Sequence, residues 1–142
     1  MINSLLIINL KFFLCDKFDT FVRKILTSDM NTCKRIKIKR ENTFKLIERG
    51  VKWLEIRLYR GVFSRVDKGD IIELYNGNNS VIVVIDNKEV LGSIEDVLCN
   101  RLIRIGSTPY VREEDISNYY NQFYSREALK KHKVVVLKIS LI

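Results

Sequence analysis

The stretch Gly50-Val51-Lys52-Trp53-Leu54-Glu55-Ile56-Arg57 decides how the rest of the chain is interpreted. A glycine that can end a helix is followed here by a strand-like run in which two cations and a carboxylate stand among large apolar residues. Side chains alternate between the two faces of a strand, so Trp53, Glu55 and Arg57 are expected on one face. Lys52 would then share the opposite, apolar face and lie at its open end.

Composition indicates one globular domain with a polyanionic partner. The chain has 142 residues and a formal net charge of +8, and each cation that neutralises a phosphate releases a condensed counterion. The three cysteines, Cys15, Cys33 and Cys99, form no C-x-x-C pair, and His132 is the single histidine. We therefore expect no disulfide framework, no metal site and no cofactor, and a reducing, cytoplasmic location.

Residues 1–29 differ in character from the rest of the chain. Their apolar run, residues 4–15, is interrupted by Asn9 and Lys11, is too short to span a bilayer and lacks a cleavage site, so no membrane association is expected. Apolar residues at helical spacing over 18–26 leave a short amphipathic helix as an alternative. We expect an N-terminal appendage or a misassigned start, and a self-sufficient domain over residues 30–142 that begins near Met30.

The first half of that domain reads as strands around one helix. Alternation predicts a strand from Lys34, and Asn42 or Thr43 is expected to cap a helix that Gly50 ends. Residues 59–65 read as a loop, and residues 71–75 as a strand. The Asn76–Asn79 segment predicts a hairpin turn, which leads to a return strand over 80–85 that is buried on both faces, with a break at 86–88.

The second half is mostly helical. Ser93 is expected to cap one helix reaching residue 102, and Glu113 to begin another with a core-facing, tyrosine-rich stripe. A short helix near residue 126 and a closing strand over 134–142 complete the chain. These elements predict an α+β domain around a small, strongly curved sheet or barrel. Regular β-α-β alternation and a glycine-rich phosphate loop are both missing from the pattern.

Several motifs in order resemble the ASCH family. They are a helix that ends in glycine, the pattern G-x-K-x-x-E-x-R over residues 50–57, and the Gly69-Asp70 turn before the next strand. The resemblance covers roughly residues 33–142 and implies a PUA-like fold, a small mixed β-barrel with flanking helices. It also implies an association with RNA.

By this resemblance, Lys52, Glu55 and Arg57 line the cleft of an RNA-binding or modified-nucleotide-binding module. Neighbouring cations and aromatic residues would contact the ligand, so the expected binding residues are Arg57, Tyr59, Arg60, Lys37, Lys39 and Arg65.

The resemblance also implies an alternative, a ribonuclease or an acylcytidine amidohydrolase. Lys52 would act as base or nucleophile if neutral and would hold an oxyanion if charged, with Glu55 as a second proton-transfer group. The acylcytidine hydrolases of the family resemble G-x-K-T-x-T-x-R, with a threonine nucleophile where this chain has Glu55. Ribonuclease-like members use a lysine, a tyrosine and a serine; Lys52 and Ser125 match two of these, with Tyr59 or Tyr124 for the third.

Simpler roles stand beside these. Lys52 is also consistent with a lysine that snorkels at a strand end, and Glu55 and Arg57 with a solvated ion pair. Trp53 is consistent with a packing residue, and Ser125 with a helix cap. A protein-interaction module is a further alternative, favoured if residues 1–29 present an exposed apolar face.

Overall fold

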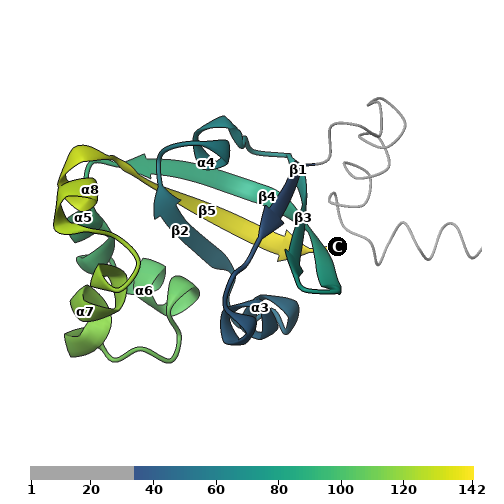
Figure 1. Cartoon of the computed structure of the whole chain (residues 1–142), viewed down its shortest axis with the longest axis horizontal. Coiled ribbons are helices and arrows are strands. Elements are labelled where there is room, and N and C mark those ends of the chain that lie inside the picture. The colour runs from purple at the N-terminus through teal and green to yellow at the C-terminus, as the bar shows by residue number, and fades with distance from the viewer. Residues whose placement is uncertain (1–33) are drawn as a thin grey trace, which may run out of the picture.

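One curled sheet of five strands organises residues 34–142, the part of the chain that the computed structural model describes (Figure 1). The expectations for residues 1–29, Cys15 and Cys33 lie outside the described residues. In order, the elements are β1 (Lys34–Lys37), α3 (Glu41–Glu48), β2 (Leu54–Leu58), α4 (Val62–Arg65), β3 (Ile71–Asn76), β4 (Asn79–Leu91), α5 (Ile94–Leu98), α6 (Arg101–Ser107), η2 (Glu113–Asp115), α7 (Ile116–Asn121), α8 (Arg126–Lys131) and β5 (Val134–Leu141).

The sheet is open between its first two strands in sequence. Its order is β1-β3-β4-β5-β2; β1 runs parallel to β3, and the other neighbours are antiparallel. β1 and β2 are therefore its two edges, and α3 is the connection between them. The predicted α+β class is confirmed.

Helix α3 forms because its apolar residues recur at helical spacing. Phe44 and Ile47 are buried, and Lys45 pairs with Glu41 at 2.8 Å on the exposed side. The helix begins at Glu41, earlier than the expected cap at Asn42 or Thr43, and no side chain caps its first turn. Gly50 follows the helix with a φ of 73°, the left-handed conformation that favours glycine, as the sequence predicted.

The hairpin between β3 and β4 is confirmed, with Asn76 paired to Asn79 and Gly77 in the turn at a φ of 57°. The break expected at residues 86–88 is wrong. β4 is one strand of 13 residues that absorbs the irregularity as a register shift between Ile85 and Asn87, where a bulge bends the strand. One strand can therefore pair with β3 along its first half and with β5 along the rest.

Two other expected segments differ from the structure. The loop expected over residues 59–65 contains the short helix α4. The single helix expected after Ser93 is two helices, α5 and α6, because the Asn100 side chain accepts a hydrogen bond from the Ile103 backbone N–H and starts a new helix. α6 then packs closely on β2, and Trp53 N donates to the carbonyl of Gly106 at 3.1 Å.

The two faces of the sheet carry separate hydrophobic clusters. Strand β5 serves both, with Val135, Leu137 and Ile139 in one cluster and Val134 and Val136 in the other. The first cluster lies inside the curl and includes residues of α3, while the second lies under α5, α6 and α7. Figure 1 shows these helices on one side of β2, and the end of α6 meets the start of that strand.

Candidate functional site

A buried chain of three charged side chains lies at the start of β2. The Nζ atom of Lys52 is 3.1 Å from Glu55 Oε2, and Arg57 Nε is 2.5 Å from Glu55 Oε1. Lys52 and Glu55 are buried, and the Arg57 side chain is only 28% exposed, so the Glu55–Arg57 pair is not the solvated pair that the sequence left open. The carboxylate of Glu55 therefore receives a cation on each of its oxygens.

The strand phase expected for Lys52 is wrong. Within β2 the alternation holds, because Leu54 and Ile56 enter the apolar cluster under the helices while Glu55 and Arg57 point to the other face. The strand begins only at Leu54, so Lys52 lies before the pleat and is free of its period. Its ammonium group turns back to Glu55 instead of staying with the apolar face.

Lys52 is held by acceptors alone. Its Nζ atom donates to the carbonyl oxygens of Leu54 at 2.7 Å and Ser107 at 2.8 Å, in addition to its contact with Glu55. A neutral amine would turn its lone pair toward one of these oxygens, so these contacts favour the charged form against the effect of burial. The same bonds join the start of β2 to the end of α6.

Burial is the largest single influence on both pKa values of this pair, but it sets the direction of the shift only for Lys52. It lowers the pKa of the Lys52 ammonium, against the opposing attraction of Glu55. Burial would raise the pKa of the Glu55 carboxyl, but Lys52 and Arg57 outweigh it and hold that pKa below its ordinary value. Glu55 is therefore ionised between its two cations at neutral pH.

One carboxylate oxygen in the pair has unused capacity. Glu55 Oε2 is buried and receives no hydrogen bond of acceptable geometry from any residue in 34–142, although it lies within ion-pair distance of Lys52. Buried oxygens that accept no hydrogen bond are rare in native proteins. Because the oxygen is fully buried, a ligand does not reach it in this structure, and the Lys52 ammonium is its charged neighbour.

A cavity of about 430 Å³, here called the inner cavity, opens onto these side chains. It lies between the chain that follows β1 and strand β2, at the open side of the sheet. Glu55 is the one carboxylate among its described lining residues, against five cations: Lys39, Arg40, Lys52, Arg57 and Arg60. The excess of positive charge suits an anionic ligand.

Aromatic side chains from α7 and the residues after it form the facing wall. Tyr119, Tyr120, Phe123 and Tyr124 all line the inner cavity. Tyr120 is buried, as expected of a core-facing stripe, but Phe123 is 41% exposed, so the core-facing prediction is wrong for that residue. Burial raises the pKa of the Tyr119 hydroxyl, which keeps it a neutral hydrogen-bonding group.

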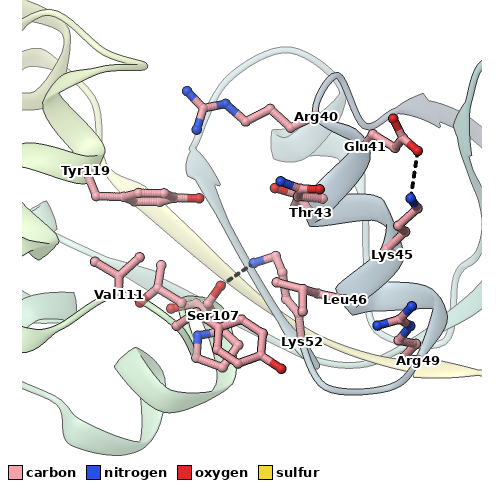
Figure 2. A pocket seen from close by; sticks show the side chains of 14 residues that line it. Arg40, Glu41, Thr43, Lys45, Leu46, Arg49, Lys52, Ser107, Val111 and Tyr119 are labelled. Atoms are coloured by element: carbon pink, nitrogen blue, oxygen red, sulfur yellow. Dashed lines mark hydrogen bonds and ion pairs between the residues drawn. The ribbon is translucent and has the colours of Figure 1, made fainter.

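A second cavity of about 660 Å³, the outer cavity, adjoins the first. Both are lined by Arg40, Thr43, Lys52 and Tyr119, so they share a wall. Figure 2 shows the outer cavity, with Tyr119 directed across it toward Thr43 on α3, and Lys52 reaching toward Ser107. Together the cavities form one cationic depression between α3 and the end of α6.

Of the remaining predicted binding residues, some line the inner cavity and others do not. Lys39 and Arg60 line the inner cavity with the three motif residues. Lys37, Tyr59 and Arg65 are not among its lining residues, and the Lys88 ammonium lies 5.3 Å from the ring centre of Tyr59.

Ser125 also lies outside the lining of the inner cavity. Its hydroxyl caps α8 by accepting a hydrogen bond from the backbone N–H of Ala128 at 3.1 Å, the simpler role that the sequence had left open.

Sequence reasoning missed three parts of the site. Arg40 was predicted only as the end of a basic, phosphate-contacting stretch that begins at Lys34, and not as a residue of the cleft. Ser107 contributes a backbone carbonyl that no side-chain motif reports, and Phe123 was assigned to the core. The sequence showed that Tyr119 and Phe123 recur at helical spacing, but it did not show that Arg40 lies against them. Arg40 covers the Phe123 ring at 4.2 Å, which holds one cation against the aromatic wall.

Within residues 34–142, no group of three or more metal-ligating side chains comes together. In the same part of the chain, every helix is too short or too polar to cross a bilayer.

No protein-family model matches the sequence, and no curated protein matches it either. Solved structures do. The crystal structure of hypothetical protein PH0355 matches at a TM-score of 0.68 and 28% identity, over 78% of this chain and 100% of that one. Protein PF0455 from Pyrococcus furiosus, solved by NMR, matches at a TM-score of 0.62 and 25% identity, over 77% and 96% of the two chains.

A third match is a mutant of ZmASCH from Zymomonas mobilis, with a TM-score of 0.52 and 14% identity over 75% of this chain and 66% of that one. These likenesses confirm the predicted fold class: a small, mixed, PUA-like barrel, here a curled half-barrel with flanking helices. Its structural neighbours include an ASCH protein.

Proposed function

We propose that this domain binds RNA or a modified nucleotide in the inner cavity. The observation that carries the proposal is the convergence of five cations and four aromatic side chains around a single carboxylate. Phosphates pair with lysine and arginine, and unstacked bases pack on aromatic rings. A nucleotide presents both groups, and the cavity volume of about 430 Å³ lies in the range of small-ligand sites.

The cations divide into two kinds. Lys52 and Arg57 are engaged by Glu55, so they form the floor of the cavity and fix the carboxylate. Lys39 and Arg60 are exposed at its rim, where a phosphate can reach them. Rim contacts to phosphate supply affinity, and Glu55 holds the two floor cations in place.

Likeness to an ASCH protein bears on the fold of this domain. At 14% identity it supports the architecture alone, so the nucleic-acid ligand rests on the charges and rings of the cavity. The ordered residues Lys52, Glu55 and Arg57, which resemble the ASCH pattern, lie on the cavity floor.

Binding of single-stranded RNA as a function of salt tests the proposal. We expect affinity to fall steeply as salt rises, and the double substitution Lys39→Gln, Arg60→Gln to reduce the slope of log K against log salt by roughly 1.4, about 0.7 for each phosphate contact. Lys68→Gln, Lys131→Gln removes the same charge from exposed positions outside both cavities and serves as the control. Equal slopes for the two double variants would sink the proposal.

A hydrolase is the second candidate, favoured by the 3.1 Å contact between Lys52 Nζ and Glu55 Oε2 at the cavity floor. Two groups at this distance can exchange a proton while a substrate is bound. Incubation of RNA and of an N4-acylated cytidine with the protein tests it. We expect Glu55→Gln to abolish turnover of both substrates without unfolding the protein; turnover that survives this substitution rules out the pair as the proton-transfer groups.

The protein-interaction alternative depends on residues 1–29, which lie outside the described residues, so it remains a prediction.

A further inference from the structure

We propose that the outer cavity binds a second nucleotide, so that the ligand is a single strand of at least two residues rather than a free mononucleotide. The inference rests on the proposed function of the inner cavity. The two cavities share the wall formed by Arg40, Thr43, Lys52 and Tyr119, which makes them neighbouring subsites on one path.

The size of the depression favours more than one nucleotide. Each cavity alone, at about 430 and 660 Å³, has the volume of a site for one small ligand. A mononucleotide in the inner cavity would leave the larger, outer cavity empty. A strand that continues past Lys52 would occupy both.

Cations mark the course of such a strand along α3. Arg40 is the residue before the helix and Arg49 the residue after it, so both ends of α3 present a guanidinium at the outer cavity (Figure 2). At a rise of 1.5 Å per residue their backbones are about 13 Å apart. A single phosphate is much smaller than this separation, so the two arginines suit different phosphates of one strand.

The negative charge at this surface is already neutralised. Glu41 is the one carboxylate among the described lining residues of the outer cavity, and it pairs with Lys45 at 2.8 Å. Arg49 makes no ion pair with any residue in 34–142, so its charge is available to a phosphate.

Tyr110 supplies a surface for the second base. Its side chain is 77% exposed, although it lines the outer cavity, and no other ring in residues 34–142 packs on it. Large aromatic side chains are usually much more buried than this. A backbone hydrogen bond from Val111 N to the Thr108 carbonyl, at 3.0 Å, closes the turn that carries the ring. Base stacking needs such an open face, and it tolerates any base.

Three ligands that carry the same base separate the contribution of the second base to affinity from that of the second phosphate. A nucleoside 5′-monophosphate has one base and one phosphate, a nucleoside 3′,5′-bisphosphate adds a phosphate without a base, and a 5′-phosphorylated dinucleotide adds both. Calorimetric titration at low salt is expected to rank their affinities in that order, with the dinucleotide at least about tenfold tighter than the monophosphate.

Two substitutions outside the inner cavity then show which residue produces the higher affinity for the dinucleotide. Tyr110→Ala is expected to lower dinucleotide affinity at least about fivefold and bring it to the level of the bisphosphate. Arg49→Ser is expected to weaken both ligands that carry the second phosphate. Neither residue lines the inner cavity, so monophosphate affinity should stay the same. Leu102→Ala and Arg101→Ser, exposed positions outside both cavities, are the matched controls.

The measurements distinguish failure of the second subsite from failure of the proposed function. Equal affinity for the monophosphate and the dinucleotide, or a dinucleotide gain that Tyr110→Ala and Arg49→Ser leave intact, overturns the second subsite and keeps the proposed function. Absence of binding by all three ligands and by longer single-stranded RNA overturns both.

Discussion

Lys52 donates a hydrogen bond at 2.8 Å to the carbonyl oxygen of Ser107, a residue 55 positions further along the chain. This bond and the contact of the same ammonium with Glu55 connect the end of α6 to the floor of the inner cavity. The site and the packing of the helices on β2 therefore share one side chain. Lys52 has a structural role in addition to its proposed place in binding.

Removal of that ammonium should cost stability. Lys52→Met leaves two carbonyl oxygens and part of a buried carboxylate without their cation, so we expect the free energy of unfolding to fall by about 3 kcal/mol. In the double variant Lys52→Met, Glu55→Gln, Arg57 also loses its carboxylate, so we expect no recovery of the lost stability. Urea denaturation of the three proteins measures both effects, and a single variant as stable as the wild type contradicts the structural role.

Acid should weaken the fold through Glu55. Its folded pKa lies below its ordinary value of 4.5, so the unfolded chain binds a proton first as pH falls. The stability contributed by the ionised carboxylate is present above pH 4.5 and is lost as pH falls through the lower, folded pKa. We expect the free energy of unfolding to drop more steeply below pH 4.5 in the wild type than in Glu55→Gln. Parallel pH profiles would contradict this assignment.

Gly106 should not accept a larger side chain. A Cβ atom there would lie 2.7 Å from Leu54 Cδ1 and 2.9 Å from Trp53 Cε2, closer than such atoms approach. We expect Gly106→Ala to lower the free energy of unfolding by about 1–3 kcal/mol through overpacking, and to weaken ligand binding because Ser107 follows directly. Gly92→Ala is the control, since its Cβ would meet Asp96 at an ordinary 3.5 Å. Thermal unfolding of the two variants decides the matter.

Tyr119 should contribute to ligand affinity more than to the fold. Its ring is half-buried and forms part of the aromatic wall, so Tyr119→Leu removes a stacking surface worth about 1–3 kcal/mol of binding free energy. Tyr75→Leu removes a similarly half-buried ring that Arg35 covers outside both cavities. Fluorescence titration with single-stranded RNA should show loss for Tyr119→Leu alone; equal losses would mean that the wall makes no contact.

Local patterns predicted much of this fold. The helix ending at Gly50 and the hairpin at Gly77 depend on positive φ values, which the glycines at these positions predict. The register of β4 did not follow, because the polar residues near Asp86 read as a break, while pairing with β5 carries the strand through them. Tertiary pairing outweighed local propensity there.

The site was predicted in part for a similar reason. Lys52, Glu55 and Arg57 were named from one stretch, and they do come together, but the strand period placed Lys52 on the wrong side. Period two applies only where the backbone is pleated, and β2 starts after Lys52. The contributions of Ser107 and Arg40 depend on contacts between distant segments, which spacing along the chain does not encode.

The sheet's open side gives the site a mechanical property. β1 and β2 are the two strands without a shared ladder, and the inner cavity lies between β2 and the residues that follow β1. Strands that are neighbours in the sheet are hydrogen-bonded to each other and would have to break those bonds in order to separate. Here widening of the cavity would break no strand ladder, but it would move α3, whose Phe44 and Ile47 are buried in the first hydrophobic cluster. The cost of admitting a larger ligand therefore falls on side-chain packing and not on the hydrogen bonds of the sheet.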